Sequence, residues 1–248
     1  MAIARRVSAV FGVRPGEGAR VAALIGHSLF NGIFCAFFLT AANALFLDRF
    51  EISYLPLAYI AAAAVGYVAI LLFSRLEKSV GVGTLLVTNL AVLVVLSGAF
   101  WALSGATGNR LVLFAMFVFV GPMFSLIALG YWGLAGRLFD LRQGKRLFGL
   151  VGAGEEVSTI VGLFSIPFFI RALGGPQPLL LFATAGLAGS LVAVFLITRA
   201  FRATLAASEE EAPEEARKKG AGLGDLLKVR YFLLMAASVI LLNLAHYS

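Results

Sequence analysis

The sequence has 248 residues, of which 60% are hydrophobic and only 13% are charged. A soluble domain has roughly 45–50% apolar and about 25% charged residues, and a helix crosses a bilayer with about 20 apolar residues. Runs of that length recur along this chain. The composition therefore excludes a soluble protein, and the net charge of +7 indicates membrane topology rather than binding to nucleic acid. The fold class is predicted to be all-α, a polytopic membrane protein in contact with the lipid bilayer.

Residues 1–20 form the first predicted segment. Apolar residues recur with helical spacing from Ile3 to Phe11, while Arg5 and Arg6 point away from them. This pattern predicts an amphipathic helix in the plane of the cytoplasmic membrane surface that ends at Pro15. A frayed tail is the alternative.

Residues 21–201 are predicted to form a six-helix transmembrane bundle. Each apolar run is close to the length that spans a bilayer. The fifth span is expected to begin between Leu147 and Val157 and to end before Arg171. The other five are predicted at residues 21–47, 52–73, 80–103, 111–134 and 179–197.

Two segments follow the bundle. Residues 202–230 are highly charged and are predicted to be a cytoplasmic linker, flexible or partly helical. Residues 231–248 are predicted to be a seventh transmembrane helix. Six spans, a long loop and a seventh span resemble the layout in which major facilitator transporters join two six-helix halves. We therefore expect the seventh helix to begin a second half, and the chain to be part of something larger.

The distribution of Lys and Arg predicts the orientation of the chain. Seventeen lie on one side of the predicted spans, and only Arg49, Arg110 and Arg171 lie on the other. Basic residues accumulate on the cytoplasmic side of membrane proteins. The N-terminus is therefore predicted to be cytoplasmic.

A dense group of charges stands between the fourth and fifth spans. Clustered cations there would draw an anionic nucleotide to the inner mouth of a transporter. The simpler alternative is a cytoplasmic loop that touches anionic lipid head groups. Asp140 is expected to form an ion pair with the neighbouring cations. This basic loop comprises Arg137, Asp140, Arg142, Lys145 and Arg146.

Glu155 and Glu156 are the sharpest site candidates. If the fifth helix begins at Leu147, they lie about 12–14 Å along it. A carboxylate at that depth needs a partner, a proton or a water-filled cavity. One of the two would then face a cavity and carry a proton-linked role. If the helix begins near Val157 instead, both carboxylates cap its N-terminus at the surface.

Polar residues inside the spans complete the candidate list. Asn31, Asn43 and Asn89 are expected to find internal partners or to line a substrate site. Gly154, Ser158 and Gly162 recur every four residues and predict close packing against another helix. No metal site, cofactor or catalytic group is predicted, because no ligand or nucleophile spacing appears. The protein is not predicted to be an enzyme.

The residues RLFDLRQGKRLFGLVGAG, 137–154, resemble the bacterial branch of the ATP/ADP translocase (nucleotide carrier) family, which has the major facilitator architecture. The stretches ALFLDRF, 44–50, and LPLAY, 55–59, are similar to the same branch. The resemblance covers the six-helix half. Exchangers of this family carry a basic residue followed by Asp in the first helix, whereas residues 31–47 contain no Lys or Arg.

The resemblance implies a transporter in a bacterial inner membrane that moves a nucleotide or another anionic solute by alternating access. Its site would be lined by Asn31, Asn43, Asn89 and one of the two carboxylates. A second bundle would come from a missing segment or a second copy. The alternative is a membrane anchor or regulatory module for a cytoplasmic sensor, which transports nothing.

Overall fold

The computed structural model describes residues 12–77 and 79–210. These residues form helices and connecting turns without a strand, and six of the helices are long and apolar enough to cross a membrane. The chain is therefore an all-α, multi-pass membrane protein, as predicted. The predicted N-terminal amphipathic helix lies almost wholly, and the seventh span wholly, outside the described residues.

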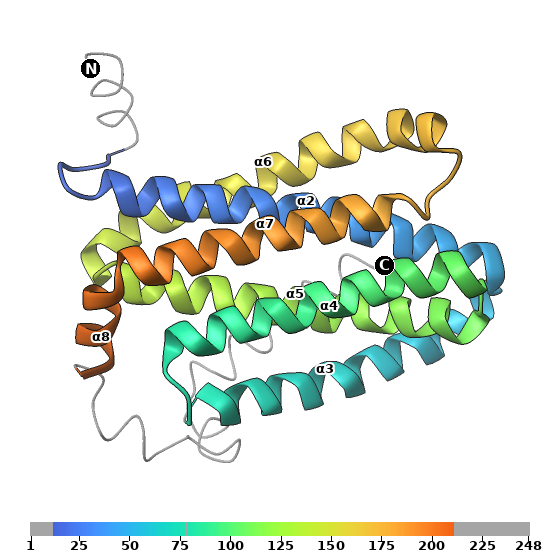
Figure 1. Ribbon diagram of the computed structural model, residues 1–248, viewed down its shortest axis with the longest axis horizontal. Helices are drawn as coiled ribbons and strands as arrows, with labels where there is room; N and C mark the ends of the chain where they lie inside the picture. Colours follow the sequence, from blue (N-terminus) through green and yellow to red (C-terminus); the bar gives the residue numbers. More distant parts are fainter. Residues whose placement is uncertain (1–11, 78, 211–248) are drawn as a thin grey trace, which may run out of the picture. The chain divides into compact units, whose positions relative to one another are not determined.

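The six spanning helices run back and forth along one bundle (Figure 1). The helix α8 (Arg202–Glu210) occupies the start of the predicted linker. The spanning helices are α2 (Gly18–Arg49), α3 (Leu55–Glu77), α4 (Val82–Thr107), α5 (Arg110–Leu138), α6 (Leu141–Leu173) and α7 (Leu179–Ala200), with a short 3-10 helix η1 (Ile52–Tyr54) before α3.

The fifth span begins earlier than predicted. It starts at Leu141, because Asp140 accepts hydrogen bonds from the backbone N–H groups of Arg142 and Gln143, and the Gln143 side chain bonds back to the backbone of Asp140. This capping box satisfies N–H groups that a helix start otherwise leaves free. Arg142, Lys145 and Arg146, which the sequence analysis placed in a loop, thus lie in the first turns of a 33-residue helix.

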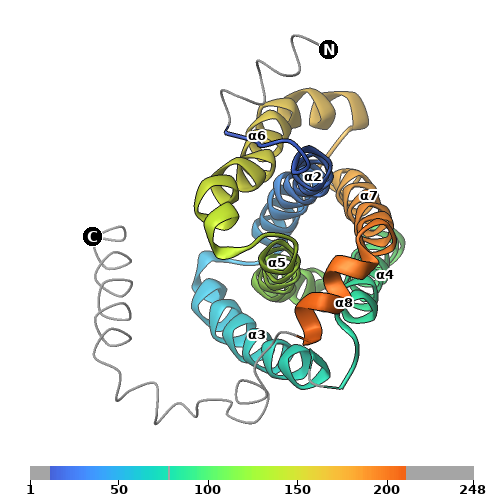
Figure 2. The same ribbon diagram turned by 90° about the vertical axis from the view of Figure 1, so that its left-hand side faces the viewer.

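The helix α2 is the centre of the packing. It contacts α6 and α7 most extensively and also α5, whereas α3 packs mainly against α5. The end-on view shows α3 and α6 on either side of α5, with α4 and α7 together on the opposite side (Figure 2). Buried apolar residues from α2, α4, α5, α6 and α7 form the main core.

The bundle consists of two similar three-helix units. Phe50 ends α2 and Phe139 ends α5 with the same backbone angles, φ −123° and ψ 140°, and an acidic residue follows each. The two phenylalanines stand 89 positions apart, and many buried positions of α2 correspond to buried positions of α5 at the same offset. Buried pairs that follow it are Leu24 with Leu113, His27 with Met116, Phe34 with Met123, Phe38 with Ile127, Phe46 with Ala135 and Ala58 with Leu147.

The two units are inverted relative to each other. The packing of α6 on α2 corresponds to that of α3 on α5, and the packing of α7 on α2 corresponds to that of α4 on α5. Arg20 near the start of α2 donates to the Leu138 carbonyl at the end of α5, and Arg110 at the start of α5 donates to the Arg49 carbonyl at the end of α2. The first three helices and the last three therefore form an inverted repeat, in which α2 and α5 are the equivalent inner helices.

Close contact between α2 and α6 depends on small residues. A Cβ atom on Gly32 would collide with the hydroxyl of Ser158 and the backbone carbonyl of Glu155, and one on Gly154 would collide with the hydroxyl of Ser28. Gly154, Ser158 and Gly162 are all buried on the face of α6 that meets α2. The predicted packing role of this stripe is confirmed.

Candidate functional site

The two carboxylates lie near the middle of α6. Because the helix begins at Leu141, Glu155 and Glu156 stand about 21–23 Å from its start, at 1.5 Å per residue. Neither carboxylate caps the helix, so the interpretation that placed both at the surface is wrong. The longer-helix interpretation is correct about their position inside the span, although the helix begins six residues before Leu147.

The two carboxylates point in different directions, as adjacent helical residues must. Glu155 is half-buried against α2, where the Cys35 thiol donates to its Oε1 atom at 3.8 Å. Glu156 is exposed on the outer face of α6. At the equivalent positions of α3, 89 residues earlier, stand Gly66 and Tyr67, so only the second unit carries charge here.

A second polar group crosses the core between α2 and α7. The Ser190 hydroxyl lies 2.6 Å from Asn31 Oδ1, to which it donates, and 2.9 Å from His27 Nδ1. All three side chains are buried. With the Ser190 proton given to Asn31 Oδ1, the Ser190 oxygen can accept from His27 in the tautomer that carries its proton on Nδ1. The Asn31 amide nitrogen has no hydrogen-bond partner among the described residues.

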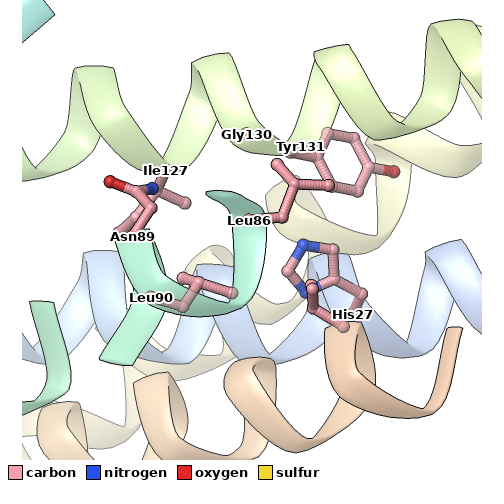
Figure 3. Close-up of a pocket in the computed structure, with 8 residues that line it drawn as sticks. His27, Leu86, Asn89, Leu90, Ile127, Gly130 and Tyr131 are labelled. Atoms are coloured by element: carbon pink, nitrogen blue, oxygen red, sulfur yellow. The ribbon is translucent and has the colours of Figure 1, made fainter. Parts of the chain in front are cut away.

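A small cavity lies beside His27, where α2, α4, α5 and α7 meet (Figure 3). Its volume is about 10 Å³, which is enough for about one water molecule. His27, Asn89 and Tyr131 are its polar neighbours, and the remaining lining residues are apolar or glycine. The Tyr131 hydroxyl is turned away to donate to the Val151 carbonyl at 2.7 Å. The space holds at most a water molecule and is not a nucleotide site.

The three predicted asparagines do not converge on one site. Asn31 is buried in the polar group on α2, whereas Asn43 donates to the Leu39 carbonyl of its own helix at 2.8 Å. Asn89 donates to the Leu126 carbonyl of α5 at 3.2 Å. Each asparagine finds an internal partner, as expected for polar groups in a span. Of the three, only Asn89 borders the small cavity.

The members of the basic loop have separate structural roles. Arg137 forms an ion pair with Glu77 at the end of α3, at 3.0 Å. Asp140 caps α6 instead of pairing with its neighbours, so the predicted ion pair is absent among the described residues. Arg142 is exposed, and so is Lys145. These two side chains are the members of the loop that remain open to solutes or lipid head groups.

Arg146 ties the start of the described chain to α6. Its guanidinium donates to the Gly12 carbonyl and lies 2.6 Å from Glu17 Oε1. The backbone N–H of Arg14 donates to Glu17 Oε2 at 2.8 Å. This N–H holds the pKa of Glu17 below its ordinary value of 4.5, assisted by Arg146 and opposed by burial. The anchored segment ends where α2 begins.

The anchor of Glu17 predicts a loss of local order in acid. Because the folded pKa of Glu17 is lowered, its contribution to stability is complete above pH 4.5 and is lost as the pH falls below that value. Backbone amides of residues 12–17 should therefore exchange hydrogen faster in acid, after correction for the intrinsic pH dependence of exchange. Glu17→Gln should produce the same loss at neutral pH, whereas Glu77→Gln should leave these amides protected. Equal protection in all three proteins would contradict the assignment.

The sequence alone did not reveal the group formed by His27, Asn31 and Ser190. His27 and Asn31 are four residues apart and thus share a helical face, which was the available signal. Their partner lies on α7, and no spacing within the sequence identifies it. Comparisons with protein-family models, curated proteins and solved structures give no match for this chain.

Proposed function

We propose that this protein is a membrane transporter of the nucleotide-carrier type. It moves a nucleotide or another anionic solute by alternating access across a bacterial inner membrane, with its N-terminus in the cytoplasm. The observation that carries this proposal is the pair of carboxylates at the middle of α6. The exposed member of the pair, Glu156, is central to it.

An exposed carboxylate at this depth is difficult to reconcile with lipid around the whole of α6. Ionisable side chains inside membrane spans face protein or a water-filled cavity, and burying an Asp at a helix centre costs about 2.5–3.5 kcal/mol on insertion scales. No Lys or Arg pairs with Glu156 among the described residues. The face of α6 around Glu156 is therefore proposed to border a water-filled solute pathway.

The inverted repeat supports transport over a purely structural role. Inverted three-helix repeats are the building plan of many secondary transporters, which bind their solutes near the bilayer midplane at a repeat interface. In this bundle α3 and α6 bury little of their surface. They lie on either side of α5, on the face of the bundle away from α4 and α7 (Figure 2). A second bundle packed against the face formed by α3, α5 and α6 would enclose Glu156.

The charge distribution agrees with an anionic solute that enters from the cytoplasm. The end of the bundle where α2 and α6 begin holds the basic loop, while the described opposite end holds Arg49, Arg110 and Arg171. Exposed Arg142 and Lys145 would concentrate anions at that entrance. A proton carried by a mid-membrane carboxylate would partly offset the charge of the solute.

A non-transporting membrane anchor is the second candidate. One observation favours it: α2 contains no Lys or Arg between Arg20 and Arg49, so no cation from this inner helix reaches the mid-membrane level to bind phosphate. Solute counterflow in liposomes separates the two functions. A carrier should accumulate labelled solute against an internal unlabelled pool, whereas an anchor should give no uptake with any nucleotide.

A further inference from the structure

A groove at the end of the bundle opposite the basic loop carries two charges that lack ion-pair partners. The groove lies where α2 ends and where η1 and α5 begin, and its volume is about 850 Å³. Leu47, Asp48, Arg49, Phe50, Glu51, Ile52, Ser53 and Arg110 line it.

Four of the lining residues are charged, and two of them neutralise each other. Arg49 Nε lies 3.1 Å from Asp48 Oδ2. Arg110 has no carboxylate partner among the described residues, although it donates to the Arg49 carbonyl and stacks 5.1 Å from the centre of the Phe50 ring. The Glu51 carboxylate accepts a 3.4 Å hydrogen bond from the Ser53 hydroxyl and has no cationic partner among the described residues. The groove therefore presents one cation, Arg110, and one anion, Glu51, that have no ion-pair partner in the part of the chain that the structure describes.

Apolar side chains stand beside these charges. Ile52 is 75% exposed and Leu47 is 50% exposed. Leu47 lies near the end of α2 and Ile52 lies at the start of η1, between two helices that are long and apolar enough to cross a membrane. A ligand that suits this position carries both charged and apolar groups and is present in the membrane.

We propose that this groove binds phosphatidylethanolamine, a phospholipid whose head group carries a phosphate and a primary ammonium and no further charge. The phosphate pairs with Arg110 and the ammonium donates to Glu51. The acyl chains run down past Leu47 and Ile52 into the bilayer. A glycerol head group lacks the cation for Glu51, and a choline head group has no N–H to donate.

The test is the lipid composition retained by the full-length protein. The protein is placed in nanodiscs with equal amounts of the ethanolamine, glycerol and choline phospholipids, transferred to detergent, and examined by native mass spectrometry. Phosphatidylethanolamine should be the retained lipid. Arg110→Gln and Glu51→Gln should each lower its retention by about tenfold. Added glycerophosphoethanolamine, which has no acyl chains, should not displace it.

Two matched variants separate lipid binding from folding. Arg171→Gln removes a cation from the same end of the bundle but outside the groove, and it should not change retention. Arg110→Lys keeps the charge while weakening the contacts that hold the end of α2, and it should retain the lipid. The proposal is overturned if no lipid is retained, if the glycerol or choline lipid is retained equally well, or if Glu51→Gln has no effect.

Discussion

Replacing Glu156 by Gln should lower solute exchange by about tenfold or more, because the proposed pathway passes this carboxylate at the middle of the span. Gln keeps the size of the side chain and its capacity for hydrogen bonds but cannot carry a charge or release a proton. Glu155→Gln should have a smaller effect, because Glu155 faces α2 and contacts Cys35 rather than the exposed side of α6. Initial rates of exchange in proteoliposomes measure both variants.

The control for this prediction is Glu77→Gln, which removes a carboxylate from the end of α3 and breaks only the ion pair with Arg137. It should leave the exchange rate within about twofold of the unmodified protein, as surface ion pairs contribute little. The role proposed for the mid-membrane carboxylates would be withdrawn if the double variant Glu155→Gln/Glu156→Gln exchanged solute normally at every pH.

Replacing Gly32 by Ala should destabilise the bundle by about 3 kcal/mol, toward the upper end of the usual cost of overpacking. The added Cβ would collide with the backbone carbonyl of Glu155, which cannot move without shifting α6 as a whole. The Ser158 hydroxyl would collide as well, although it can rotate away. The midpoint of thermal unfolding in detergent measures the loss.

Gly26 provides the matched control on the same helix. A Cβ atom at Gly26 meets no atom within 4 Å, so Gly26→Ala should keep the fold and stabilise α2 by about 0.5–1 kcal/mol through its better helix propensity. Equal effects of the two substitutions would show that close contact between α2 and α6 does not limit stability.

The sequence predicted the spans well because a bilayer imposes one clear length on an apolar helix. All six described spanning helices occupy the expected segments, and the small-residue stripe of α6 packs as expected. The start of α6 was predicted too late, because its first turns are charged. The Asp140 and Gln143 capping box was the local signal for a helix start at Leu141.

Contacts between helices were much less accessible from the sequence. The partner of His27 and Asn31 is Ser190 on α7. The spacing of residues in the sequence does not indicate which residues of α2 and α7 lie close together. The Asn43 side chain donates a hydrogen bond to the Leu39 carbonyl of its own helix. This local hydrogen bond competes with any role of Asn43 in a shared site. The inverted repeat was also hidden, because the two units share burial positions and the Phe–acid endings of α2 and α5 rather than residue identities.

The most direct test of the proposed transport is counterflow with the natural full-length protein in liposomes. Liposomes loaded with unlabelled nucleotide are diluted into a trace of the labelled compound, and a panel of nucleotides and phosphate is compared with a neutral solute. The proposal predicts transient accumulation of at least one anionic solute above the level of protein-free liposomes, with no accumulation of the neutral one. Uptake equal to that of protein-free liposomes for every solute would contradict transport and favour the membrane anchor.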